Sequence, residues 1–291
     1  MRRRALLAVL AVLSLVAIGC DLRLAVPPGT APVRYRDLVF TTVTTTSNVV
    51  YGSAPNQQGQ TVSLALDVYK PVGDTITSRP AIVWVHGGSF SSGDKTSPEL
   101  VDEATTFAKK GFVNVSINYR LSSGCSAGTP TPACVTSIVD AKHDAQAAVR
   151  FLRANAATYG VDANRIAVAG TSAGAITALN VGFDPTEPGS SGNPGYSSAV
   201  NAAVSLSGAA VLTTPSSGDA PSLLFHGTAD TVVPYQWALN TQTQATAAGL
   251  TCELTSWTGA GHVPYAQHRD EILDQTTNFL YWTMNLPSAA H

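Results

Sequence analysis

Short apolar runs alternate with longer helix-forming segments along this chain, and the alternation limits the folds that it can adopt. The clearest apolar runs lie at residues 80–88, 112–120, 165–170 and 221–227. A short, continuous apolar run is typical of a strand buried on both faces, as in a parallel sheet covered by helices. Segments with apolar residues at helical spacing lie at 98–111, 140–160 and 271–285. The pattern predicts strands that alternate with helices.

Two stretches before the first of these runs have a different pattern. Residues 36–46 and 60–71 alternate apolar and polar side chains, and the polar stretch 47–59 lies between them. Such alternation is typical of half-exposed strands, so we expect an antiparallel hairpin with a long loop. With further strands at 201–208 and 251–257, the pattern predicts an α/β fold. We expect one doubly wound, mostly parallel sheet with an N-terminal antiparallel hairpin and helices on both faces.

The N-terminus has the features of a targeting segment. The basic residues MRRR precede an apolar stretch of about 15 residues, shorter than the roughly 20 that a bilayer-spanning helix needs. This predicts a signal peptide at 1–19. Its ending, AIGC, resembles the lipobox of bacterial lipoproteins, in which Cys20 would be acylated. We expect an exported protein, either a cell-envelope lipoprotein or a secreted one.

The rest of the chain shows no composition break and no internal repeat. We therefore expect a linker at 20–37 and a single domain at 38–291. The stretch 184–198 is rich in Gly, Pro and Ser, which predicts a mobile loop that either lines a site entrance or makes a surface connection.

Charge and cysteine content exclude several classes of function. The net charge is −2 and no basic run follows the first four residues, so a nucleic-acid partner is not expected. Cys125 and Cys134 flank a short loop, which favours a local disulfide in an exported protein, and Cys252 is expected to be a buried thiol. The chain has no CxxC or HExxH motif and its six histidines are dispersed, so no metal site is expected. Membrane contact is expected only through the lipid anchor, and the oligomeric state stays open.

Two serines lie in a Gly-x-Ser-x-Gly pattern, Ser126 and Ser172. A nucleophilic serine on this motif needs a strand that ends at the serine and a helix that begins directly after it. Ser172 follows the apolar run at 165–170 and precedes a helix-compatible segment, whereas Ser126 lies in a proline-containing loop. The context therefore selects Ser172 as the candidate nucleophile.

A nucleophilic serine also needs a base and an acid that orients the base. In one common arrangement both follow the serine in the chain, the acid first. Asp230 lies in a turn after the run at 221–227, and His262 lies in a glycine-rich loop after the next strand. Other acids and bases lie in less suitable places: Asp184, Asp219, His226 and His268. We expect His226 to be a packed structural residue and His268 a surface one.

Backbone amides are also needed to stabilise the charge that develops on a carbonyl oxygen. The sequence VHGGSF at 85–90 follows a buried strand, and its glycines permit a tight turn with amides that point inward. Gly87 and Gly88 are the candidate donors, together with Ala173, the residue after the serine.

The whole motif set resembles that of bacterial carboxylesterases of the α/β-hydrolase superfamily, related to hormone-sensitive lipase and to feruloyl and acetyl-xylan esterases. The motifs occur in order at 83–95, 113–121, 148–175, 223–234 and 259–262. The resemblance implies an α/β-hydrolase fold with Ser172, Asp230 and His262 as the triad. Ser89 stands where many members carry a third glycine. The stretch between 208 and 221 is too short for a large cap domain.

These expectations lead to one functional prediction. The chain is predicted to hydrolyse carboxylic esters through an acyl-enzyme intermediate on Ser172, without a metal or cofactor. An open site favours short acyl groups or acylated polysaccharides, so the expected partner is a small-molecule or polysaccharide-linked ester. Two alternatives remain: a serine peptidase of the prolyl-oligopeptidase type, and an inactive surface binding protein on the same fold.

Overall fold

The computed structural model describes residues 21–122, 125 and 131–289. The predicted signal peptide at 1–19, the acylated Cys20 and the loop residue Ser126 lie outside the described residues. No helix in the described part of the chain is long and apolar enough to cross a membrane.

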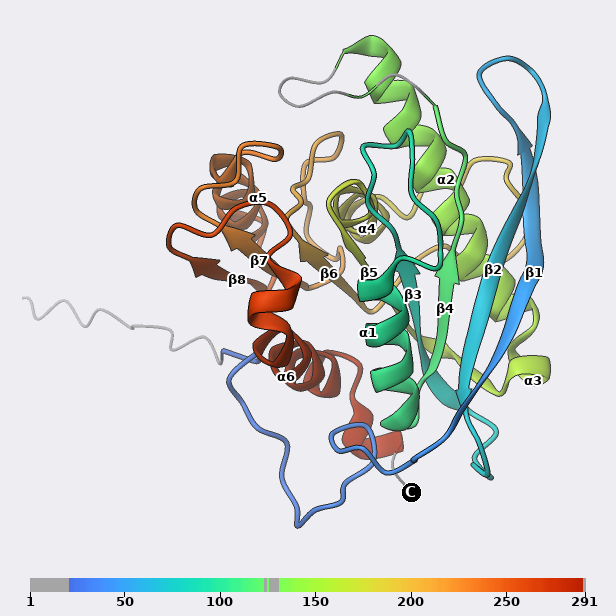
Figure 1. The fold of residues 1–291 in the computed structure, drawn as a ribbon, viewed down its shortest axis with the longest axis vertical. Coiled ribbons are helices and arrows are strands. Elements are labelled where there is room, and N and C mark those ends of the chain that lie inside the picture. The colour runs from blue at the N-terminus through green and yellow to red at the C-terminus, as the bar shows by residue number, and fades with distance from the viewer. Residues whose placement is uncertain (1–20, 123–124, 126–130, 290–291) are drawn as a thin grey trace, which may run out of the picture.

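A single eight-stranded sheet forms the centre of the molecule (Figure 1). In spatial order its strands are β1 (Val43–Pro55), β2 (Thr61–Pro71), β4 (Val113–Ile117), β3 (Arg79–Val85), β5 (Val161–Thr171), β6 (Ala202–Leu206), β7 (Ser222–Gly227) and β8 (Cys252–Trp257). The pairs β1–β2 and β2–β4 are antiparallel, and all the other neighbours are parallel. This confirms the predicted doubly wound, mostly parallel sheet with an N-terminal hairpin.

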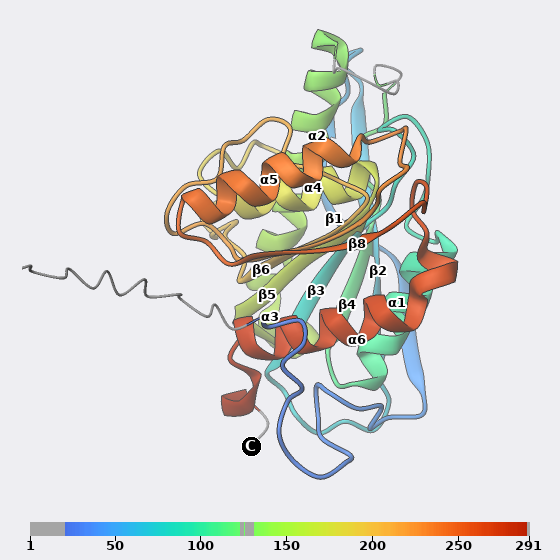
Figure 2. The ribbon, with the colours of Figure 1, turned by 90° about the vertical axis from the view of Figure 1, so that its left-hand side faces the viewer.

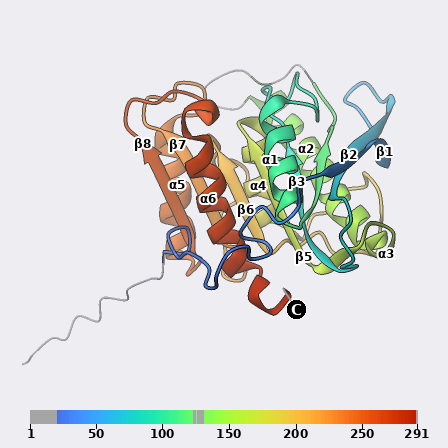
Figure 3. The ribbon, with the colours of Figure 1, turned by 60° about the horizontal axis from the view of Figure 1, so that its bottom comes forward.

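Helices cover both faces of the sheet (Figures 2 and 3). One face carries α1 (Pro98–Lys109) and α6 (Tyr265–Thr283), which is followed by the 3₁₀ helix η1 (Leu286–Ala289). The other face carries α2 (Pro132–Ala154), α3 (Ala156–Tyr159), α4 (Ala173–Phe183) and α5 (Tyr235–Ala247).

Both faces of β3 are buried, which explains why its sequence is a continuous apolar run. Val83 and Val85 belong to the core beneath α2 and α4, whereas Ile82 and Trp84 belong to the core beneath α1 and α6. Every residue of this strand is buried. A central strand with a helix layer on each side needs apolar side chains at successive positions, so the continuous run predicted it correctly.

The hairpin differs from its predicted bounds. β1 begins at Val43, so residues 36–42 of the predicted first strand are not in the sheet. It extends to Pro55, so the predicted loop at 47–59 shortens to the turn at 56–60. β1 is an edge strand, most of its side chains are exposed, and its pairing with β2 is interrupted at two register shifts. Backbone pairing at an edge does not require apolar side chains, and the shifts break the alternation that would reveal the strand.

Two helices also depart from the sequence expectations. α2 begins at Pro132, before the predicted start at 140, because Pro fits the first helical position and Thr131 Oγ1 accepts a hydrogen bond from the Cys134 amide at 3.2 Å. α5 was not predicted. Its buried positions are Ala238, Thr241 and Ala245, so it has no stripe of large apolar residues to signal a helix.

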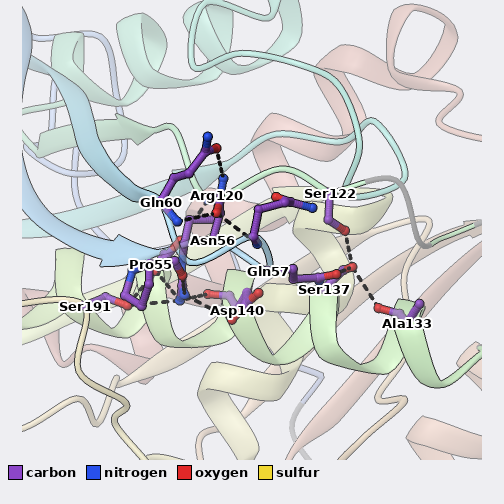
Figure 4. Close-up of polar contacts among 12 residues, drawn as sticks. Pro55, Asn56, Gln57, Gln60, Arg120, Ser122, Ala133, Ser137, Asp140 and Ser191 are labelled. Carbon is purple, nitrogen blue, oxygen red and sulfur yellow. Dashed lines mark hydrogen bonds and ion pairs between the residues drawn. The ribbon is translucent and has the colours of Figure 1, made fainter.

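Arg120 connects the hairpin, α2 and the stretch at 184–198 (Figure 4). Its guanidinium donates to the Pro55 carbonyl at 2.8 Å, pairs with Asp140 at 3.1 Å and donates to Ser191 Oγ at 3.2 Å. Arg150 donates to carbonyls of the same stretch, at Pro188 and Gly192. Two arginines thus hold this stretch against α2, where it forms a surface connection.

The three cysteines in the described part of the chain lie as the sequence predicts. A disulfide joins Cys125 to Cys134, across the start of α2. Cys252 is a buried free thiol, and burial raises its pKa to about 11. It is therefore protonated at neutral pH.

Candidate active site

Ser172 lies at the sharp turn between β5 and α4. Its backbone has φ 53° and ψ −116°, a strained conformation for a residue with a side chain. The strand ends at Thr171 and the helix begins at Ala173. Only 8% of Ser172 is exposed. The strand–turn–helix arrangement predicted for this serine is present.

Close packing around the turn explains both glycines of the Gly-x-Ser-x-Gly motif. A Cβ at Gly174 would lie 1.9 Å from the Val85 carbonyl oxygen, and a Cβ at Gly170 would lie 2.5 Å from the backbone of Gly174. Strand β3 and the start of α4 are thus in backbone contact. Any side chain at either position would force the turn apart.

Three side chains form a hydrogen-bonded series. The Nε2 of His262 lies 2.7 Å from Ser172 Oγ, and its Nδ1 lies 2.7 Å from Asp230 Oδ2. A carboxylate only accepts hydrogen bonds, so Nδ1 carries the hydrogen and Nε2 accepts from the serine hydroxyl. The structure thus brings together the serine, acid and base that the sequence predicts, from the connections that follow the carboxyl ends of β5, β7 and β8.

Asp230 is held in place as a carboxylate. Its Oδ1 accepts the amides of Val232 at 2.9 Å and Val233 at 3.0 Å. Burial by itself would raise the pKa of Asp230, but hydrogen bonds from His226 and His262 outweigh it and hold the pKa well below its usual range. The carboxylate therefore stays ionised at neutral pH and can support a positive charge on His262.

His226 and Ser207 are two site residues that the sequence reasoning did not identify. The Nε2 of His226 lies 3.2 Å from Asp230 Oδ2 and 2.9 Å from the Val233 carbonyl oxygen, so this buried histidine contacts the acid rather than only filling space. Ser207 Oγ accepts the amide of Val263 at 3.0 Å and so fixes the loop that carries His262. The short spacing in HGTAD, 226–230, is the sequence signal for His226. Ser207 has none.

The other candidate acids and base have different partners. Asp184 pairs with Lys142 at 2.5 Å, at the far end of α4 from Ser172. Asp219 accepts hydrogen bonds from Ser216, and His268 stacks on Trp257 with ring centroids 4.0 Å apart. These contacts support the choice of Asp230 and His262.

The glycine-rich loop after β3 lies over the serine. A Cβ at Gly87 would lie 3.2 Å from Ser172 Cβ, and Gly88 has φ 109°, which favours glycine. Ser89 and Phe90 also have positive φ, of 54° and 62°. A glycine at position 89 would relieve this strain. Within the described residues the amide of Gly88 donates to no protein acceptor, as an oxyanion donor requires.

The side chain of Tyr119 holds this loop through contacts with His86 and Gly87. Its hydroxyl donates to the carbonyls of His86 at 3.1 Å and Gly87 at 3.4 Å, and its ring stacks on the His86 ring with centroids 4.3 Å apart. Burial lowers the pKa of His86, so its ring is neutral at neutral pH. Its Nδ1 lies 2.6 Å from the Gly87 carbonyl oxygen and donates to it. The loop conformation is therefore fixed by side chains that do not reach the cavity.

A cavity of about 470 Å³ opens above Ser172 and His262. Its walls include Gly87, Gly88, Ser89, Glu99, Val232 and Val263. Residues 207–221, which connect β6 to β7, contain no helix. In the described residues, no three His, Cys, Asp or Glu side chains gather as metal ligands. The arrangement suits nucleophilic attack by a serine on a carbonyl, in a site without a helical cap between β6 and β7.

Comparisons with known proteins agree with this geometry. A model of the family BD-FAE matches residues 66–217, and a model described as TAP-like protein matches residues 202–287. A solved structure, "Thermogutta terrifontis esterase 2 phosphorylated by paraoxon", is 26% identical and superposes with a TM-score of 0.67, over 81% of this chain and 93% of that one. The propionate-bound form of the same esterase is 27% identical, with a TM-score of 0.65 over 83% and 93% of the two chains.

Curated relatives match over shorter stretches. Phenmedipham hydrolase of Pseudarthrobacter oxydans is 38% identical over 103 residues, which is 34% of this chain and 19% of that protein. Acetylcholinesterase of Gallus gallus is 32% identical over 142 residues, which is 47% of this chain and 17% of that protein. The matches thus span about a fifth of the length of these relatives.

Proposed function

The chain belongs to the BD-FAE family of α/β-hydrolase carboxylesterases, and we propose that it hydrolyses carboxylic esters with Ser172 as nucleophile. The observation that supports this most strongly is the unbroken series from Ser172 Oγ through His262 to Asp230, with 2.7 Å at each contact. The series lies directly under the glycine-rich loop at 86–90, where a carbonyl oxygen would meet free amides.

In the first step His262 Nε2 takes the hydroxyl proton while Ser172 Oγ attacks the ester carbonyl carbon. Asp230 keeps the hydrogen on Nδ1 and stabilises the imidazolium that forms. The amides of Gly88 and Ala173, with Gly87 as the third candidate, stabilise the oxyanion. The imidazolium then protonates the leaving alcohol, and the acyl group stays on Ser172.

In the second step water replaces the alcohol. His262 removes a proton from water, the hydroxide attacks the acyl-serine carbonyl, and the same amides stabilise the second oxyanion. Collapse returns the proton to Ser172 Oγ and releases the carboxylic acid. Every proton transfer uses His262, so the mechanism needs no metal or cofactor.

The open cavity supports a preference for short acyl chains or for esters on extended carbohydrates. With no helix between β6 and β7, a long acyl chain would find little apolar wall beyond Val232 and Val263. The test is hydrolysis of p-nitrophenyl esters from acetyl to palmitoyl by residues 21–291. Highest kcat/KM on acetyl to butyryl esters supports this substrate class, and preference for chains above about eight carbons contradicts it.

We also propose that the protein is exported and held at the cell envelope by an acylated Cys20. The described chain begins close to this residue: the amides of Leu22 and Arg23 donate to the Glu253 carboxylate at 2.6 and 2.8 Å. Because residues 22 and 23 are docked on β8, the tether would be short and the domain would stay close to the membrane. Mass spectrometry of the N-terminal peptide from the membrane fraction tests this, and a free or absent cysteine contradicts it.

A further inference from the structure

One carboxylate lines the same cavity as Ser172 and His262. Glu99 lies in the first turn of α1, and its Oε1 is 3.5 Å from Oγ1 of Thr171, the residue directly before the serine. The acid is thus on the wall of the cavity, close to the position where an ester would react.

The charge of Glu99 has no cationic partner in the described part of the chain. No ion pair to it is found there, whereas Asp102, on the same helix, pairs with Arg269 at 2.5 Å. Apart from His262, none of the described residues that line the cavity has a basic side chain. A substrate that enters the cavity therefore meets an uncompensated negative charge.

A second carboxyl group lies one turn further along α1 but does not add to this charge. Glu103 is only 5% exposed and its Oε2 has no hydrogen-bond partner among the described residues. Burial, with the nearby charges of Glu99 and Asp102, raises the pKa of Glu103 well above its usual value, so it stays protonated. Of these carboxyl groups, Glu99 is the one that faces the cavity.

We propose that Glu99 is a specificity-determining residue, which makes the site favour positively charged esters, such as those with a trialkylammonium group, over neutral esters of the same shape. This inference rests on the proposed ester hydrolysis at Ser172. A fixed charge in a partly enclosed cavity attracts a cation across a few ångströms, and a quaternary ammonium has no N–H donors that must find new partners. The same charge disfavours anionic esters. Because the cavity is open to solvent, salt is expected to weaken the preference.

Pairs of substrates with equal shape isolate the charge. Acetylcholine and 3,3-dimethylbutyl acetate differ by one positive charge in the alcohol part of the ester. Ethyl 4-(trimethylammonio)butanoate and ethyl 5,5-dimethylhexanoate differ by one in the acyl group. We expect kcat/KM to favour the cation about fivefold to tenfold in at least one pair, through a lower KM. Equal values within each pair, or preference for the neutral ester in both, overturn the inference.

Three variants assign the preference to the carboxylate. Glu99→Gln keeps the size of the side chain and is expected to reduce the cation-to-neutral ratio to about one, whereas Glu99→Asp keeps part of it. Glu187→Gln is the matched control: it removes the same charge from a side chain that is 79% exposed, lies after the carboxyl end of α4 and does not line the cavity. A ratio that Glu99→Gln leaves unchanged, or that Glu187→Gln lowers equally, contradicts the assignment.

A binding measurement separates this inference from the proposed function. If wild type cleaves the neutral esters without preferring cations, the function stands and the role of Glu99 is wrong. If it cleaves no ester, the proposed function is wrong. Calorimetric titration of acetylcholine into Ser172→Ala, with and without Glu99→Gln, then tests the role of Glu99 alone. Binding that is at least fivefold tighter with Glu99 supports the inference, and equal binding contradicts it.

Discussion

The Nε2 of His226 lies 3.2 Å from the same carboxylate oxygen of Asp230 that His262 contacts at 2.7 Å. Asp230 Oδ2 thus contacts two imidazole rings, of which only that of His262 also contacts Ser172. The second ring is buried completely and also donates to the Val233 carbonyl. It fixes the carboxylate in the orientation that His262 needs.

Replacement of His226 by alanine is therefore expected to lower kcat about tenfold, with little change in KM, because the carboxylate loses a donor and can rotate. Steady-state kinetics on p-nitrophenyl butyrate measures this. His226→Gln, which retains an N–H donor, should recover part of the loss. If both variants unfold at the same temperature as wild type and keep full kcat, the positioning role is wrong.

Replacement of Asp230 by asparagine should lower kcat about 10⁴-fold, the size found for this change in serine proteases, because the amide no longer holds the hydrogen on Nδ1 of His262. The measurement is the single-turnover rate of acylation. A loss below about tenfold would show that another group orients His262.

The same carboxylate makes stability depend on pH. Its pKa is lower in the folded protein than its ordinary value of 3.8, so its ionised form stabilises the folded state above that pH. This contribution is lost as the pH falls through the folded-state pKa. The difference in Tm between wild type and Asp230→Asn should therefore be larger at pH 7 than at pH 3. A difference that does not change with pH contradicts the assigned shift.

Removal of the Tyr119 hydroxyl tests the support of the glycine-rich loop. Tyr119→Phe keeps the stacking on His86 but loses the bonds to the carbonyls of His86 and Gly87. We expect kcat to fall about threefold to tenfold while KM stays constant, since the loop amides stabilise only the oxyanion. Unchanged kcat would show that the loop keeps its conformation without this hydroxyl.

Gly174→Ala should destabilise the fold by about 3 kcal/mol or more, because its Cβ would lie 1.9 Å from the Val85 carbonyl oxygen. Urea unfolding monitored by fluorescence measures the free energy of unfolding. Gly261→Ala is the control, since nothing lies within 4 Å of a Cβ there. Equal stabilities of the two variants would contradict the close contact between β3 and α4.

The sequence predicted the parts of the site that local structure determines. The sequence favours Ser172 over Ser126 because it predicts a strand before Ser172 and a helix after it, and the structure has this arrangement. Ser126 lies outside the described residues. Asp230 follows a buried strand and His262 a glycine-rich turn, so each could be located from its own neighbours.

Features that depend on tertiary contacts were not predictable in the same way. Ser207 acts through a contact with Val263, which is distant in the chain, and no local pattern reveals it. The contact of His226 with Asp230 has only their short spacing as a signal. The buried positions of α5 are alanines and a threonine, and β1 is an edge strand, so neither has the apolar pattern of a core element. The stretch at 184–198 has a loop composition, but Arg120 and Arg150 fix it.

The central claim is that Ser172 is the nucleophile, and covalent labelling tests it most directly. Paraoxon phosphorylates the related Thermogutta terrifontis esterase 2, which supports its use as a probe here. Residues 21–291 would be incubated with paraoxon and digested, and the phosphorylated peptide identified by mass spectrometry, beside Ser172→Ala. We predict one diethyl phosphate per chain, on Ser172, and none on the variant. Labelling of another serine, or equal labelling of Ser172→Ala, would contradict the account.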